Sequence, residues 1–175
     1  FGDGSGVFFD TAADTAGAID PLLLVRPHSG ADNAEPSGQS SMAMALLGYG
    51  ALTGSRRHLE LADAALTVAG SVATRDPRFA GWTLAAAEAR LAGPVQVAIV
   101  GDGPAAEDLR RVALRATVPG LVVVSGPPDA PGVPLLAGRP LGGGEPAAYA
   151  CRGFVCDRPV TSPSDLAAAL AGSAP

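Results

Sequence analysis

Two prolines mark the places where the spacing of apolar residues changes, and this change constrains the fold more than any other feature. Between Pro36 and Pro94, apolar residues recur every three or four positions, which is typical of amphipathic helices. After Pro94 comes a β-branched run, Val95–Val100, which is typical of a buried strand. The residue before a proline avoids the helical conformation, so each proline also sets a boundary. The sequence therefore predicts a helical part followed by a part that contains a sheet.

The first part is predicted to hold antiparallel helices, because links of only a few residues make consecutive helices neighbours. The predicted helices cover 37–52, 55–75 and 78–91. Tyr49 and Trp82 could stack against a sugar, but their helical spacing favours packing in the core. These alanine-rich helices alone give a thin core, so we expect a larger helical array or an oligomer partner to cover one face.

The second part is predicted to be a small α/β domain. A strand at 95–100, a helix at 105–116 and a strand at 121–124 form a βαβ unit, and such units pair their strands in parallel. Further elements are expected as a helical turn near 135–137, a strand at 147–151 and a helix at 165–171. The predicted fold class is α+β, with helical hairpins over 1–93 followed by a small C-terminal domain with a parallel sheet over 94–175.

The turn after the first strand contains Gly101-x-Gly103-x-x-Ala106, which resembles a dinucleotide-binding fingerprint. Two features count against that function. Pro104 occupies the loop, and the second strand ends in Ser125 without an acid that would bind a ribose. A tight strand-to-helix turn is the interpretation that we favour.

The stretch 26–41 holds the densest set of polar side chains that could point into a pocket. Its right half begins a helix, since Ser37 or Ser40 can accept a hydrogen bond from a free backbone N–H. The positive end of a helix is a natural place to hold a carboxylate, a phosphate or a sugar hydroxyl. The ordinary alternative is that the segment only turns and caps, because Asp, Asn, Ser and Gly are the common turn residues.

Composition excludes several classes of partner. The net charge is −5, so we expect neither a nucleic-acid nor a membrane partner, because both require a basic patch. No signal segment opens the chain, and two cysteines do not make a disulfide framework, so we expect a cytoplasmic location. The start at Phe1 looks like that of a fragment. All 12 basic residues are arginine, which indicates a GC-rich genome, and we expect a bacterial protein. Cys151 and Cys156 are interpreted as two structural thiols. His28 and His58 have no partner at ligand spacing, so neither a metal nor a cofactor is predicted.

Several segments, taken in order, resemble the spermatogenesis-associated protein 20 / YyaL-like family. The matching segments are 6–11, 24–28, 32–40, 148–152 and 156–160. Members carry a thioredoxin-like domain and then an (α/α)6 toroid similar to N-acylglucosamine 2-epimerases and six-hairpin glycosidases. The resemblance implies that 1–93 are the closing helices of such a toroid, and that the remainder of the polypeptide or an oligomer partner completes it.

A toroid implies a sugar-like ligand, and the residues then divide into two roles. Asp32 is the candidate acid or base, and His28 is the candidate for proton transfer. The candidate ligand-binding residues are Asp10, Arg26, Asn33, Ser37 and Gln39. A carbohydrate epimerase or glycosidase needs a closed ring, so these 175 residues alone are expected to be inactive.

The alternative is a non-catalytic scaffold or a redox-accessory interaction module. Convergence of the polar side chains at 10, 26, 28 and 32 on one cavity would favour the enzyme, and their dispersal as caps would favour the scaffold.

Overall fold

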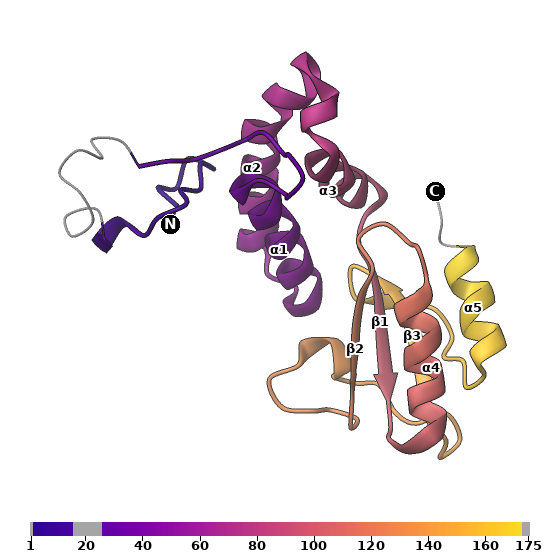
Figure 1. Cartoon of the computed structure of the whole chain (residues 1–175). Helices are drawn as coiled ribbons and strands as arrows, with labels where there is room; N and C mark the ends of the chain where they lie inside the picture. Colours follow the sequence, from indigo (N-terminus) through magenta and orange to yellow (C-terminus); the bar gives the residue numbers. More distant parts are fainter. Residues whose placement is uncertain (1, 16–25, 173–175) are drawn as a thin grey trace. The chain divides into compact units, whose positions relative to one another are not determined.

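The computed structural model describes residues 2–15 and 26–172 of the chain, and the extended run expected at 22–26 lies almost wholly outside them. The fold is α+β: the described part has five α-helices and one four-stranded sheet (Figure 1). Two compact units are present. The first comprises the described residues of 1–47 and 56–88, and the second those of 48–55 and 89–175.

The three helices predicted before Pro94 are confirmed. They are α1 (Gly38–Thr53), α2 (Arg56–Arg75) and α3 (Gly81–Ala92), and short 3-10 turns lie at η1 (Ala13–Thr15) and η2 (Pro77–Phe79). Ser37 caps α1, because its Oγ accepts a hydrogen bond from the backbone N–H of Ser40 at 3.1 Å. The predicted helix start is therefore correct at the level of its capping residue.

Small residues form the buried sides of α2 and α3. On α2 the buried positions are Ala62, Ala65 and Ala69. Ala80, just before α3, and Thr83 and Ala86 within it are buried as well. Small side chains allow helix axes to approach closely, and this fixes which side of each helix faces inward.

The prediction that Tyr49 and Trp82 pack in the core is wrong, since they are 52% and 50% exposed. Helical spacing alone therefore does not identify the buried side of these helices. The inward side of α3 follows the small residues at 80, 83 and 86, which turns Trp82 partly toward solvent.

The sheet has the strand order β2-β1-β3-β4. Its strands are β1 (Val95–Val100), β2 (Val122–Gly126), β3 (Ala147–Arg152) and β4 (Val155–Cys156). The predicted parallel pairing of the first two strands is confirmed, with Gln96 opposite Val122. β3 is antiparallel to β1, and β4 is antiparallel to β3.

The expectation of a parallel sheet is thus right for one pair and wrong for the others. To add a strand parallel to the one before it, the connection must return the chain to the end of the sheet at which that earlier strand began. Between β2 and β3 the chain forms only η3 (Pro134–Leu136), which is too short for such a crossover. β3 therefore begins at the end of the sheet where β2 stops, and it runs antiparallel to β1.

Both faces of β1 are covered. Helices α4 (Gly103–Arg115) and α5 (Pro163–Ala171) lie side by side over one face (Figure 1). Ser162 caps α5, because its Oγ accepts a hydrogen bond from the Asp165 N–H at 3.1 Å. The core on that side consists of Val95, Val97, Ile99, Ala106, Leu109, Ala113, Ala148, Leu166 and Leu170. On the other face, η3 contributes Leu135 and Leu136, which pack with Ala98 and Val100.

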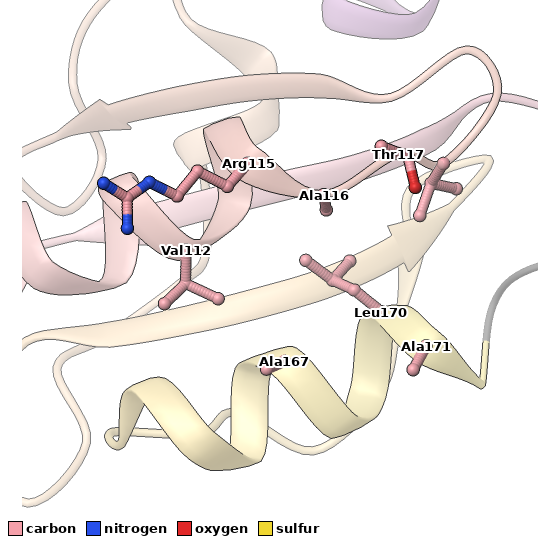
Figure 2. Close-up of a pocket in the computed structure, with 8 residues that line it drawn as sticks. Val112, Arg115, Ala116, Thr117, Ala167, Leu170 and Ala171 are labelled. Carbon is pink, nitrogen blue, oxygen red and sulfur yellow. The ribbon is translucent and has the colours of Figure 1, made fainter.

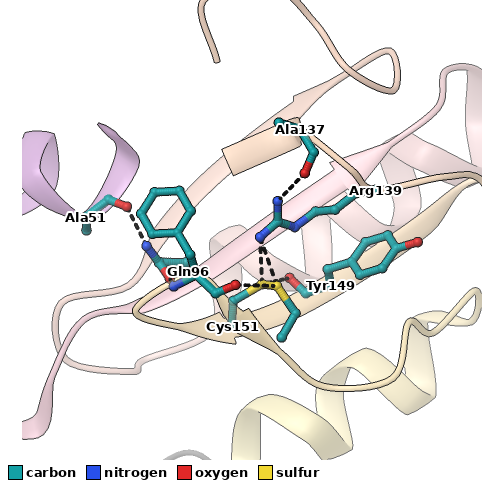
Figure 3. Close-up of a disulfide and its surroundings, with 8 residues drawn as sticks. Ala51, Gln96, Ala137, Arg139, Tyr149 and Cys151 are labelled. Carbon is teal, nitrogen blue, oxygen red and sulfur yellow. Dashed lines mark hydrogen bonds between the residues drawn. A yellow bond between two sulfur atoms is a disulfide. The ribbon is translucent and has the colours of Figure 1, made fainter. Parts of the chain in front are cut away.

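A buried glutamine joins three segments of the second unit (Figure 3). Gln96 is 2% exposed. Its Nε2 donates to the carbonyl of Ala51 at 2.5 Å, and its Oε1 accepts from the Phe154 N–H at 2.8 Å. The side-chain amide thereby fixes the last turn of α1 and the β3–β4 turn to the central strand.

Cys151 and Cys156 form a disulfide, so the interpretation of them as two separate thiols is wrong. Gly153 and Phe154 have φ values of 55° and 67°, as in the two-residue hairpin turns that need positive φ at both positions. This tight turn sets Cys151 directly opposite Cys156 in the β3–β4 pair. The spacing of the two cysteines is thus the spacing of a cross-strand pair.

Candidate functional site

Asp32 is the centre of the predicted polar site, and it is buried, with 3% exposure. Its Oδ1 accepts hydrogen bonds from the Ser37 N–H at 2.9 Å and the Ser40 hydroxyl at 2.6 Å. Its Oδ2 accepts from the Thr83 N–H at 3.0 Å. Because Ser37 precedes α1 and Thr83 lies in the first turn of α3, one carboxylate caps the N-termini of two helices.

The surroundings of Asp32 favour its ionised form. Burial by itself raises the pKa of a carboxyl, but here the hydrogen bonds from Ser37, Ser40 and Thr83 outweigh burial and lower the pKa of Asp32 below its ordinary value. A carboxylate with a lowered pKa carries no proton to donate near neutral pH and accepts one poorly. Catalysis by Asp32 stays a prediction, and this geometry favours a capping role.

Gln39 lies 1% exposed on the first turn of α1. Its Oε1 accepts from the Phe8 N–H at 2.9 Å, and its Nε2 donates to the carbonyls of Gly6 and, at 3.4 Å, Ala65. Both ends of the amide therefore bind backbone. The side chain fixes the N-terminal segment against α2, and its polar atoms face protein.

Arg26 and His28 meet at the ring of Phe9. The Arg26 guanidinium lies 4.1 Å from the ring centroid and donates through Nη2 to the carbonyl of Thr11. The His28 ring approaches the same ring edge-on, with centroids 5.5 Å apart. Arg26 is half-buried and His28 is exposed. These two predicted residues therefore share one aromatic neighbour.

The two remaining candidates are exposed. Asp10 lies close to the start of α1, since a Cβ built on Gly38 would stand 2.8 Å from its Oδ1, and its N–H donates to the Pro27 carbonyl at 2.9 Å. Asn33 lies on a turn in which its N–H donates to the Glu35 carbonyl at 2.9 Å. The structure thus brings Asp32 to Ser37 and Arg26 to His28. The side chain of Gln39 bonds instead to the Phe8 N–H and to the carbonyls of Gly6 and Ala65.

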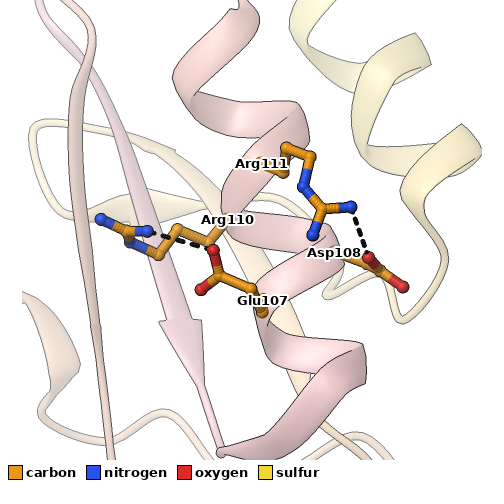
Figure 4. A network of polar contacts seen from close by, with 4 residues as sticks. All are labelled: Glu107, Asp108, Arg110 and Arg111. Atoms are coloured by element: carbon orange, nitrogen blue, oxygen red, sulfur yellow. Dashed lines mark hydrogen bonds and ion pairs between the residues drawn. The ribbon is translucent and has the colours of Figure 1, made fainter.

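Three pockets lie elsewhere, in the second unit. An apolar pocket of about 390 Å³ lies between α4 and α5, where Val112 and Leu170 contribute to its walls (Figure 2). A pocket of about 190 Å³ lies at the Gly101 turn. The Asp102 and Glu107 side chains line it, and Arg110, which lines it too, pairs with Glu107 at 3.2 Å (Figure 4). Carboxylates in that position oppose a pyrophosphate, so the turn favours the structural interpretation over the dinucleotide fingerprint.

The third pocket, of about 300 Å³, lies beside the disulfide and is lined by Arg139, Tyr149 and Cys156 among others. Sequence reasoning missed this group. The signal that it overlooked is the Gly153-Phe154 turn, which pairs the cysteines; nothing in the spacing of Arg139 indicates its place.

Within residues 2–15 and 26–172, no cluster of His, Cys, Asp and Glu side chains has the makings of a metal site. In the same ranges, no helix combines the length and the apolar character needed to cross a bilayer. The chain gives no significant match to protein-family models, to curated proteins or to solved structures.

Proposed function

We propose that the chain is a non-catalytic scaffold module, the C-terminal portion of a thioredoxin-domain-containing toroid protein, in which 1–93 close the toroid and 94–175 form a small C-terminal domain. In this proposal the helices pack against the remainder of the same polypeptide. The observation that carries it is the surface of α3. Apolar side chains lie on its exposed side as well as on the side that packs against the described chain.

Helix α3 has only two charged residues in its twelve, Glu88 and Arg90. Small residues occupy its buried side. Large apolar side chains are nevertheless exposed on it and just before it: Phe79 by 37%, Trp82 by 50% and Leu84 by 46%. A helix that is apolar almost all round belongs inside a larger assembly of helices. The expected array therefore has a specific place to pack.

The chemistry of the predicted site supports the same proposal. The N-terminus of α1 attracts an anion through its free N–H groups and its dipole. The chain itself supplies that anion, because Asp32 bonds the Ser37 N–H and Asp10 lies beside Gly38. With Asp32 and Gln39 bonded to protein groups, the polar side chains work as caps and tethers.

Hydroxyl-radical footprinting tests the proposal. Trp82, the only tryptophan of the chain, should be oxidised readily in the isolated 175 residues and protected in the natural polypeptide that contains them. Leu114 on α4, which is 57% exposed, is the reference and should be modified equally in both samples. Equal oxidation of Trp82 in the two samples would contradict the scaffold proposal.

One observation favours the alternative, a sugar-like ligand. Arg26 and His28 gather at Phe9, and the N–H of the neighbouring Asp10 bonds the Pro27 carbonyl, so three of the predicted residues lie in one region. Titration calorimetry with neutral and acidic monosaccharides distinguishes the alternatives. Heat that is lost in Arg26→Ala and kept in Arg56→Ala, a change to an exposed arginine of α2 outside the candidate site, would support ligand binding. The absence of heat would support the scaffold.

A further inference from the structure

The disulfide of the β3–β4 hairpin has a cationic neighbour. Arg139, in the loop after η3, is 7% exposed. Its Nη2 donates to Cys156 Sγ at 2.9 Å and lies 3.7 Å from Cys151 Sγ, while Nη1 donates to the Ala137 carbonyl at 2.9 Å (Figure 3). The Tyr149 hydroxyl donates to the Pro140 carbonyl at 2.6 Å and so anchors the residue that follows.

This guanidinium has no anionic partner within the described ranges. Its hydrogen-bond partners there are a backbone carbonyl and two sulfur atoms, and its Nε is buried without a hydrogen bond. Burial lowers the pKa of Arg139, but an arginine starts so far above neutral that it keeps its charge. A buried cation without an anion is unfavourable, so an anion placed at the sulfur atoms would stabilise this site.

Reduction of the disulfide creates that anion. We propose that Cys151 and Cys156 form a thiol–disulfide exchange site for a small external dithiol, in which Arg139 is a positioning residue that stabilises the thiolate. The exposed side of the pair favours one sulfur: Cys151 is 3% exposed, whereas Cys156 is half-buried and lines the hollow of about 300 Å³. This proposal does not rest on the scaffold function.

The exchange is balanced as follows. One thiolate of the external dithiol attacks Cys156 Sγ, the Cys151–Cys156 bond breaks, and Cys151 leaves as a thiolate that takes up a proton. The second thiolate of the dithiol then attacks the first dithiol sulfur, which is bonded to Cys156 Sγ in the mixed disulfide, and displaces Cys156 as a thiolate. The protein pair gains two electrons and the dithiol becomes a cyclic disulfide. In the reverse direction Cys156 is the nucleophile, because Arg139 Nη2 lies closest to it.

Two consequences follow for the reduced protein. The Cys156 thiolate should form at lower pH than an ordinary thiolate. The reduced form of the protein should also be more populated at equilibrium than it would be if no cation lay beside the disulfide. Tyr149 and Asp157 are the other titratable groups that line the hollow. The Asp157 carboxylate opposes the effect of Arg139, so Asp157→Asn should lower the pH of thiolate formation further.

The experiment uses dithiothreitol as the dithiol. The intact chain is equilibrated with mixtures of oxidised and reduced dithiothreitol, and the thiols are counted by alkylation and mass. Arg139→Gln should shift the equilibrium at least about tenfold toward the protein disulfide, which is about 30 mV for two electrons. Arg115→Gln, on an exposed arginine of α4, is the matched control and should leave the equilibrium unchanged.

A second measurement keeps the test decisive if Arg139→Gln does not fold. In Cys151→Ser, which retains the native Arg139, the rate of Cys156 alkylation by iodoacetamide is followed against pH. A midpoint clearly below about 8.5, the ordinary value for a thiol, supports the proposal. A midpoint at or above that value, or a native disulfide that dithiothreitol leaves intact in the folded protein, would make the bond a structural staple and overturn the proposal.

Discussion

Replacement of Asp32 should destabilise the helical unit by a predictable amount. Asp32→Ala removes the acceptors of the Ser37 and Thr83 N–H groups and of the Ser40 hydroxyl, all of them buried. Loss of a helix cap costs about 1 kcal/mol. Helix α3 loses its cap at the Thr83 N–H, whereas α1 keeps the Ser37 cap but loses the carboxylate that holds Ser37. A hydrogen bond to a charged group contributes about 1.5–3 kcal/mol, but bonds that share one carboxylate do not add. We therefore expect a loss of about 2–4 kcal/mol.

Asp32→Asn separates the shape of the side chain from its charge. It keeps one acceptor oxygen and places an amide N–H₂ where the second oxygen stood, so we expect a smaller loss of about 1–2 kcal/mol. Asn33→Ala, next in the chain and exposed, is the control and should stay within about 0.5 kcal/mol of the native protein. Urea unfolding followed by Trp82 fluorescence measures all of these, because Trp82 is the only tryptophan and lies on α3 beside Thr83.

The pH dependence gives an independent check on the Asp32 argument. The folded protein lowers the pKa of Asp32 relative to the unfolded chain, where a carboxyl titrates near about 3.9. Its contribution to stability is therefore complete above that pH and is lost as the pH falls through the lower, folded value. The difference between the native protein and Asp32→Asn should shrink in acid. A difference of less than about 0.5 kcal/mol for Asp32→Ala at neutral pH would refute the double-cap argument.

Four further substitutions, two of them compared with each other, test the rest of the packing. Gln96→Leu leaves two buried backbone groups without partners and should cost the second unit about 1–3 kcal/mol, measured by circular dichroism in urea. Gly6→Ala should be more destabilising than Gly4→Ala: both have positive φ, but a Cβ on Gly6 would stand 2.7 Å from Ala64, whereas nothing lies within 4 Å of one on Gly4. Leu109→Ala empties a fully buried site and should cost about 3–5 kcal/mol in calorimetric unfolding.

Local signals were enough to predict the five helices and three of the four strands in the described part of this fold; β4 was not predicted. The prolines and glycines indicate the helix boundaries, Ser37 was one of the two serines expected to cap α1, and the β-branched runs predict the parallel pair. Each of these depends on neighbours within a few residues. The antiparallel direction of β3 was not predicted. It arises because the proline- and glycine-rich loop between β2 and β3 contains no crossover helix.

The inward face of α3 was missed for a different reason. Hydrophobic spacing counts Trp82 and Leu84 as core residues, because they are the largest apolar side chains of the helix. Close packing of alanine-lined helices reverses this preference, since the smallest residues allow the nearest approach. The hydrophobic pattern therefore identified the helix correctly and placed its buried side wrongly.

The site shows the same limit in its polar residues. A carboxylate before a helix N-terminus has the same sequence signature whether it holds the helix or meets a ligand. What distinguishes the two roles for Asp32 is the Thr83 N–H, 51 positions further along the chain. Once that donor arrives, both carboxylate oxygens are bonded and the negative charge that the helix attracts is already present. A ligand anion would then have to compete with a buried, ionised side chain, so the residue type that suggested a binding site is the one that closes it.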